Sequence, residues 1–64
     1  MPMIQYGDTG QAVRVWQVIV GCDPDGEFGY VTKGATLAFQ TEHAIEIEGV
    51  VGPESWSEGL KSIQ

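Results

Sequence analysis

Apolar residues spaced three, four and seven positions apart predict three short helices in this chain. The first lies between Gly10, which can cap its start, and Gly21, which can end it. The second is expected from about Tyr30 to about His43. The third begins at Pro53, because proline is favoured at the first position of a helix. The apolar positions on the three helix faces are Val13, Trp16 and Val20; Val31, Ala35, Ala38 and Phe39; and Trp56, Leu60 and Ile63.

Two stretches of the chain share one pattern at an offset of 23 residues. Residues 25–32 and 48–55 both run acid-glycine-x-apolar-glycine-x-x-hydroxyl. In each copy we expect the acid-glycine pair to form a turn, the apolar residue to enter the core and the second glycine to cap the next helix. The hydroxyls of Thr32 and Ser55 then fall in the first helical turn, where they can bond to backbone groups or to the preceding loop.

These features predict an all-α fold: a compact three-helix bundle with Gly- and Asp-rich connecting loops, formed by residues 1–64 as one domain. Hydrophobic residues make up 42% of the chain, which is enough for a small core. The chain has a single cysteine, Cys22, and a single histidine. Neither an intramolecular disulfide nor a structural zinc site can therefore stabilise the core. The expected core consists of Ile4, Val13, Trp16, Val20, Phe28, Ala35, Phe39, Ile45, Val51, Trp56 and Leu60.

The charge balance narrows the classes of partner. Three basic and nine acidic residues give a formal net charge of −6, which repels nucleic acid and anionic membranes. The sequence shows neither a signal peptide nor an apolar run long enough to span a membrane. We therefore expect a protein that is made in the cytoplasm and is not exported by the ordinary signal-peptide route.

Catalysis and metal binding are not expected. Nothing in the sequence places Cys22 and His43 as a nucleophile and its base, and a small bundle has no deep cleft for a carboxylate pair. A calcium loop centred on Gly26 would need acids where Gly21 and Thr32 stand. The sequence thus predicts a non-enzyme without cofactor or metal, in which the acids of this loop form turns.

Three ordered motifs resemble the peptidoglycan-binding domain family over nearly the whole chain, from Ile4 to Leu60. The motifs are Gly7-Asp8-x-Gly10-x-x-Val13-x-x-Trp16-Gln17, then Asp25-Gly26-x-Phe28-Gly29-x-x-Thr32-x-x-Ala35-x-x-x-Phe39-Gln40, then Glu48-Gly49-x-Val51-Gly52-Pro53-x-Ser55-Trp56. The resemblance implies a three-helix domain of the kind attached to amidases, muramidases, transpeptidases and phage endolysins. It implies a non-catalytic module that binds peptidoglycan.

The chain departs from the family pattern at three positions. Thr36 stands where a second apolar residue is usual, Gly34 lies inside the second helix, and Ala44 replaces the glycine that usually follows that helix. A glycine within a helix costs about 0.5–1 kcal/mol relative to alanine. We expect these departures to weaken the fold slightly and to change how the second helix ends.

Five residues are candidates for hydrogen bonding to stem peptide or glycan: Asp8, Asp25, Tyr30, Thr32 and Gln40. Each has a competing structural interpretation. Asp8 and Asp25 are turn formers. Gln17 and Gln40 are separated by the same 23 residues as the two copies of the repeat, and each can tie a loop to its helix. Trp16, Trp56 and Phe39 could stack on a sugar but have the spacing of core anchors, whereas Tyr30 is expected to be exposed.

Two other functions remain open at this point. The alternative to wall binding is a phage virion structural protein, a capsid decoration or tail accessory protein that reuses the fold; the net charge favours it, because cell walls carry anionic polymers. A third possibility is a docking domain within a larger enzyme. The expected partner is thus peptidoglycan or a phage structural protein, and the expected place of action is the bacterial cell wall or a phage virion.

Overall fold

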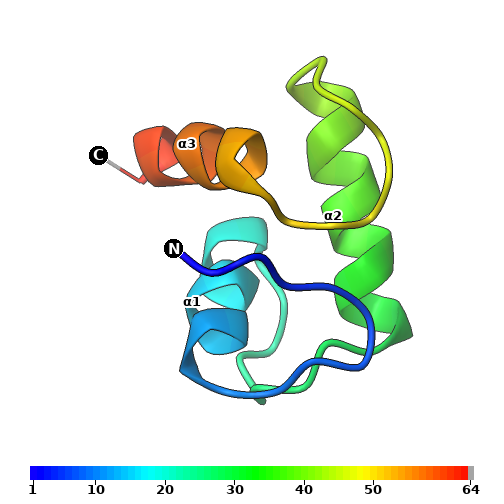
Figure 1. Cartoon of the computed structure of the whole chain (residues 1–64), viewed down its shortest axis with the longest axis vertical. Coiled ribbons are helices and arrows are strands. Elements are labelled where there is room, and N and C mark those ends of the chain that lie inside the picture. Colours follow the sequence, from blue (N-terminus) through cyan, green and yellow to red (C-terminus); the bar gives the residue numbers. More distant parts are fainter. Residues whose placement is uncertain (64) are drawn as a thin grey trace.

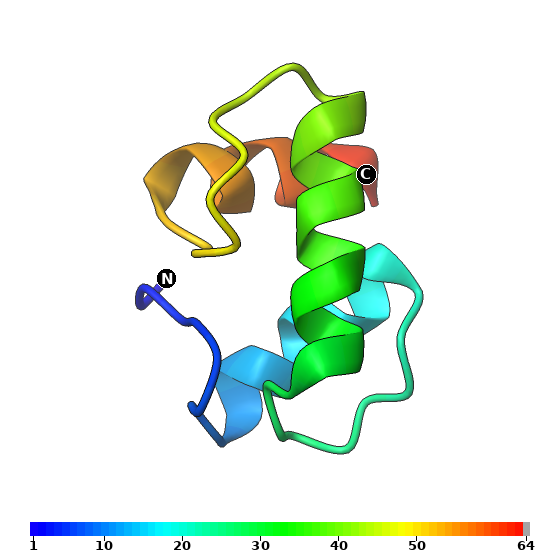
Figure 2. The ribbon, with the colours of Figure 1, turned by 90° about the vertical axis from the view of Figure 1, so that its right-hand side faces the viewer.

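Three helices form the molecule. The computed structural model describes residues 1–63, which contain α1 (Gln11–Val20), α2 (Tyr30–Glu42) and α3 (Pro53–Ser62). Helices α1 and α3 lie on one side, and α2 passes across both (Figures 1 and 2). Helix α1 packs against each of the other two. The prediction of an all-α three-helix bundle is confirmed.

Glycines mark the helix ends as the sequence predicts. Gly10, Gly29 and Gly52 are the N-cap residues of the three helices, and Pro53 occupies the first turn of α3. Gly21 ends α1 in the left-handed conformation, with φ of 81°, and its N–H donates to carbonyls of the last turn. The helix bounds therefore follow from where the chain can leave helical geometry.

The N-terminal segment, residues 1–9, joins the two copies of the repeat. Ile4 and Val51 exchange backbone hydrogen bonds of 3.2 and 2.8 Å. Further along, the Gly7 N–H donates to the Phe28 carbonyl, and the Phe28 N–H donates to the Asp8 carbonyl, both at 2.9 Å. Figure 1 shows this segment running between α1 and α3 towards α2. Both loops that precede a helix are thus bound to the same extended strand of backbone.

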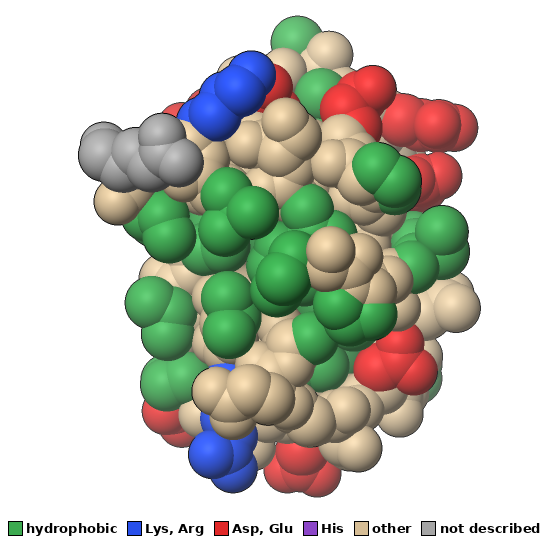
Figure 3. Space-filling model, turned by 60° about the vertical axis from the view of Figure 1, so that its left-hand side comes forward, with side chains coloured by type: hydrophobic (Ala, Val, Ile, Leu, Met, Phe, Trp, Pro, Cys, Tyr) green, Lys and Arg blue, Asp and Glu red, His purple; other side chains and the backbone are tan. Residues whose placement is uncertain are grey.

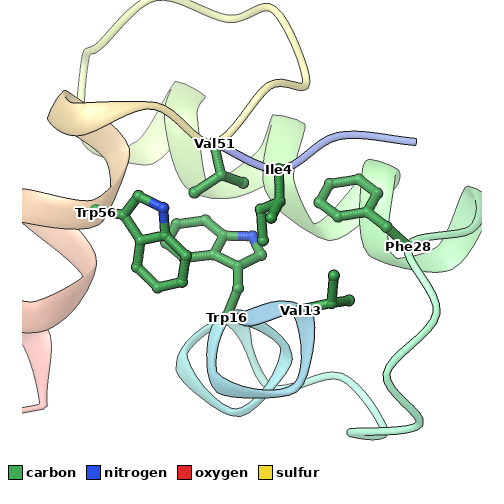
Figure 4. Close-up of a cluster of buried hydrophobic side chains, with 6 residues drawn as sticks. All are labelled: Ile4, Val13, Trp16, Phe28, Val51 and Trp56. Carbon is green, nitrogen blue, oxygen red and sulfur yellow. The ribbon is translucent and has the colours of Figure 1, made fainter. Parts of the chain in front are cut away.

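The hydrophobic core is centred on Trp16. Its ring meets the ring of Trp56 edge-on at 5.3 Å and that of Phe39 at 5.0 Å. The fully buried apolar side chains, drawn in Figure 4, are Ile4, Val13, Trp16, Phe28, Val51 and Trp56. Both tryptophans are therefore core anchors. The expected core was too large, since Val20, Ala35, Phe39, Ile45 and Leu60 are only half-buried.

The buried face of α2 is largely polar. Of the apolar face expected for this helix, Ala35 and Phe39 are half-buried and Phe39 packs against the core, but the expectation is wrong for the other two residues. Val31 is 78% exposed and Ala38 is exposed as well, whereas Thr32, Thr36 and Gln40 are buried. These side chains are buried because each finds a hydrogen-bond partner inside. Among residues 1–63, no buried side-chain nitrogen or oxygen lacks a partner.

Thr36 is satisfied on both sides of its hydroxyl. The Trp16 indole N–H donates to Thr36 Oγ1 at 2.9 Å, and the Thr36 hydroxyl donates to the Thr32 carbonyl at 2.8 Å. An apolar residue here would leave the buried indole N–H unpaired, at a cost of about 1–3 kcal/mol. The departure at Thr36 thus supplies the partner of the Trp16 indole N–H.

Helix α3 approaches α1 closely at Gly59. A Cβ atom added there would lie 2.7 Å from Trp16 Cζ3 and 3.1 Å from Ile19 Cγ2. Glycine lets the backbone of α3 rest on the indole ring. By contrast, a Cβ added at Gly34 of α2 would meet nothing within 4 Å.

The end of α2 shows the effect of the departure at Ala44. Ala44 has φ of +55°, the left-handed conformation that glycine adopts with less strain. The Ile45 N–H then donates to the Gln40 carbonyl at 3.1 Å and closes the helix end. Alanine therefore takes the backbone geometry of the usual glycine, and the helix does not end differently.

The surface combines acidic edges with apolar areas. In the face of Figure 3, hydrophobic side chains gather in the middle and carboxylates lie towards the rim. Within residues 1–63, no helix is both long and apolar enough to cross a membrane.

Candidate binding site

Gln17 organises the loop between α1 and α2. Its amide nitrogen lies 2.9 Å from Asp25 Oδ1, 3.0 Å from the Glu27 carbonyl and 2.9 Å from Thr32 Oγ1. Its Oε1 accepts the Gly26 N–H at 2.9 Å. The side chain is 1% exposed. One buried amide thus fixes the turn, the loop backbone and the first turn of α2 together.

Gln40 repeats this arrangement in the loop between α2 and α3. Its amide nitrogen donates to the Val50 carbonyl at 2.9 Å and to Ser55 Oγ at 3.0 Å, and its Oε1 accepts the Gly49 N–H at 3.0 Å. Each partner lies 23 positions after its counterpart around Gln17. Gly26 and Gly49 both have positive φ, 81° and 76°, which turns the N–H towards the glutamine. The sequence repeat is therefore a repeat of the hydrogen-bond network.

Two shallow hollows obey the same repeat. One, of about 410 Å³, lies against the start of α2 and is lined by residues 22, 23, 25, 27 and 29–32. The other, of about 180 Å³, lies against the start of α3 and is lined by residues 45, 46, 48 and 52–55. The two linings match at the offset of 23 except for residue 27. Carboxylates of Asp23, Asp25 and Glu27 line the first, and those of Glu46, Glu48 and Glu54 line the second.

Asp25 is held as a carboxylate by its neighbours. The Glu27 N–H donates to Asp25 Oδ1 at 2.9 Å, and the same oxygen accepts the Gln17 amide. These bonds lower the pKa of Asp25, mainly through the Glu27 N–H, with a smaller effect from the charge of Arg14. Because Asp25 itself is exposed, its ionised form can both hold the turn and accept a hydrogen bond from a ligand.

An aromatic pair stands beside the first hollow. Tyr30, the first residue of α2, is 78% exposed, as the sequence predicts. Its ring lies 4.9 Å from that of Tyr6, which is 51% exposed, with the planes inclined by 37°. The neighbouring Tyr30 side chain is the main reason why the pKa of the Tyr6 phenol is raised. Tyr6 was not among the residues that the sequence singled out.

The five predicted site residues fall into two groups. Asp8, Asp25 and Tyr30 reach the surface near the N-terminal segment and the first hollow. Thr32 and Gln40 are buried and bonded to loop groups. Asp8 also forms its turn, because its Oδ2 accepts the Gln5 N–H at 2.9 Å. A ligand-binding role for these residues remains a prediction.

Cys22 and His43 have separate surroundings. Burial is the main reason why the pKa of the Cys22 thiol is raised, which favours the unreactive protonated form. His43 stacks on Phe39 with ring centroids 4.0 Å apart, and its Nδ1 lies 3.6 Å from Glu58 Oε1.

Two relatives match most of this chain but extend well beyond it. An uncharacterized protein in the bpoA1 3' region of Kitasatospora aureofaciens is 36% identical over 63 residues, covering 88% of this chain and 53% of that protein. The zinc D-Ala-D-Ala carboxypeptidase of Streptomyces albus G is 33% identical over 62 residues, covering 84% of this chain and 24% of the enzyme. The chain thus spans about half, or less, of the length of these relatives. No protein-family model matches it.

Solved structures with the same fold include parts of a peptidoglycan-binding protein and of a phage endolysin. The SleB N-terminal domain superposes with a TM-score of 0.94 at 25% identity, covering 98% of this chain and 94% of that one. The endolysin of Burkholderia phage AP3 superposes with a TM-score of 0.87 at 30% identity, covering 91% of this chain and 24% of the endolysin. A peptidoglycan-binding protein from Clostridioides difficile superposes with a TM-score of 0.88 at 25% identity, covering 91% of this chain and 40% of that protein.

These likenesses define the class of the protein. The fold is that of the peptidoglycan-binding domains, and the resemblance predicted from the three sequence motifs is confirmed.

Proposed function

We propose that this chain is a non-catalytic module that binds peptidoglycan and localises a cell-wall hydrolase, its own or a phage's, on that polymer. The observation that carries the proposal is the likeness to the peptidoglycan-binding protein from Clostridioides difficile, which covers 91% of this chain. The similarity to part of a carboxypeptidase and part of an endolysin supports a role beside a catalytic unit. Concentrating an enzyme on its polymer needs only modest affinity per module.

The site we propose uses the exposed and buried candidates differently. Asp8, Asp25 and Tyr30 contact the ligand, while Thr32 and Gln40 hold the loops that form the hollows. The raised pKa of Cys22 and the shallow hollows support binding rather than catalysis. No cofactor or metal takes part in this proposal.

Co-sedimentation with purified insoluble peptidoglycan at physiological salt tests the function. We expect the soluble protein to be depleted by peptidoglycan and to remain in solution with cellulose. Equal recovery from both supernatants would end the proposal.

The net charge of −6 is the observation that favours the second candidate, a phage virion structural protein. That function has its own test. Stoichiometric recovery of the chain with assembled particles would support it, and recovery only in the soluble fraction would contradict it.

A further inference from the structure

The Tyr6–Tyr30 pair is an exposed aromatic surface with no role in the core. Both rings are more than half exposed, and they lie side by side at 4.9 Å. Large exposed aromatic side chains are costly to leave in water and supply much of the contact energy where a ligand covers them. The second copy of the repeat has Pro53 where the first has Tyr30, so the aromatic pair distinguishes one hollow from the other.

Backbone hydrogen bonds fix the two chain segments that carry the rings. Tyr6 directly precedes Gly7, whose N–H is bonded to Phe28, and Tyr30 lies two residues after Phe28 at the start of α2. The Gln5–Asp8 turn closes the other side of Tyr6. Little backbone conformational entropy is therefore lost when a ligand covers the rings.

Polar acceptors surround this aromatic surface. A hollow of about 190 Å³ extends from Tyr6 along Asp8, Thr9 and Glu27. The 410 Å³ hollow, with Asp23 and Asp25, lies beside Tyr30. Flat apolar faces next to carboxylates match a sugar ring, which has apolar C–H faces and hydroxyl donors at its edge.

The glycan strands and the stem peptides of peptidoglycan differ in charge, which allows one of them to be chosen as the ligand. The glycan backbone is made of N-acetylated sugars and is uncharged, whereas stem peptides end in carboxylates. The negatively charged surface around the two tyrosines, on a molecule of net charge −6, repels carboxylates and accepts hydrogen bonds from hydroxyls and amides. Resting on the proposed function, we infer that Tyr6 and Tyr30 form a stacking platform for the N-acetylated glycan strand of peptidoglycan.

The experiment uses two soluble probes, an N-acetylglucosamine tetrasaccharide and a sugar-free stem peptide, in NMR titrations of the whole chain. We expect the tetrasaccharide to shift the ring signals of Tyr6 and Tyr30. Tyr30→Ala and Tyr6→Ala should each weaken its binding about tenfold, within the range for loss of an aromatic stacking partner. Tyr30→Phe keeps the ring and should bind within about threefold of the wild type.

Val18→Ala is the matched control, because Val18 is 63% exposed on α1 and lines neither hollow. It should bind the tetrasaccharide as the wild type does, and the buried Trp16 and Trp56 signals should report an intact fold in every variant. Shifts caused by the stem peptide alone would overturn the glycan assignment while leaving peptidoglycan binding in place. Failure to sediment with peptidoglycan would instead remove the proposed function itself.

Discussion

Buried glutamines do at residue scale what a disulfide does in other small domains. Gln17 and Gln40 each bridge a helix, a turn and the start of the following helix through one amide group. Such groups are useful only when every polar atom is paired, because an unpaired buried group costs about 1–3 kcal/mol. Both networks meet this condition.

Gln40→Ala should lower the free energy of unfolding by about 3 kcal/mol, because it leaves the Gly49 N–H and the Val50 carbonyl without their partner. Urea denaturation followed by tryptophan fluorescence measures the change. Gln11→Ala, at an exposed position on α1, is the control and should stay within about 0.5 kcal/mol of the wild type. A loss of stability no larger than the control's would contradict the structural role of Gln40.

Asp25 makes stability depend on pH. Its pKa is lowered in the folded state, so below about pH 4 the unfolded chain binds more protons than the folded one. The stabilisation is therefore present above about pH 4 and is lost as pH falls through the native pKa. Asp25→Asn should flatten this part of a stability profile measured from pH 6 to pH 2, whereas Asp23→Asn, at an exposed position nearby, should not. Identical profiles for the wild type and Asp25→Asn would refute the assignment.

At the scale of elements, the same substitution should have opposite effects in two helices. Gly34→Ala on α2 should raise the free energy of unfolding by about 0.5–1 kcal/mol, since the added methyl meets open space and alanine favours the helix. Gly59→Ala on α3 should lower it by about 1–3 kcal/mol, because the methyl would press on the Trp16 ring. Thermal melting of both variants gives the comparison. A Gly59→Ala variant as stable as Gly34→Ala would contradict the close approach of α3 to Trp16.

The end of α2 offers a second pair. Ala44→Gly should stabilise the fold by about 0.5–1 kcal/mol, because it relieves the left-handed strain at φ +55°. Ala38→Gly, at an exposed position within α2, should destabilise it by about 1 kcal/mol. Denaturant midpoints decide the matter; an Ala44→Gly midpoint below that of the wild type would exclude strain at this residue.

Helix bounds could be predicted because glycine and proline act locally on the backbone. The buried face of α2 could not, since hydrophobicity gave no sign that Thr36 would meet Trp16 or that Gln40 would meet Gly49. Their burial depends on partners supplied by other elements. The internal repeat was the one available signal, because it placed both glutamines at equivalent positions.

The candidate site was predictable only in part for the same reason. The exposure of Tyr30 follows from its place at a helix start, next to a capping glycine. Its neighbour Tyr6 comes from a segment 24 positions earlier, and only the folded N-terminal segment brings the two rings together.

For the molecule as a whole, net charge should control binding to intact walls. Wall polymers of like sign repel a domain of charge −6, and salt screens this repulsion over about 10 Å at 0.1 M. Retention on intact walls should therefore rise between about 0.05 and about 0.3 M salt in sedimentation assays. Walls stripped of anionic polymers should show little salt dependence. Retention that falls with salt would mean that ion pairs to the wall dominate.

The N-terminal segment also governs when the molecule can form. The Trp56 indole N–H donates to the Pro2 carbonyl at 2.8 Å, a contact that spans 54 positions of a 64-residue chain. Ile4 likewise forms its backbone hydrogen bonds with Val51. On a ribosome Pro2 and Ile4 therefore lack these partners until the start of α3 has been made, and closing so long a loop slows the search. The core should therefore close only after Trp56 has been synthesised, with the helices unsupported until then.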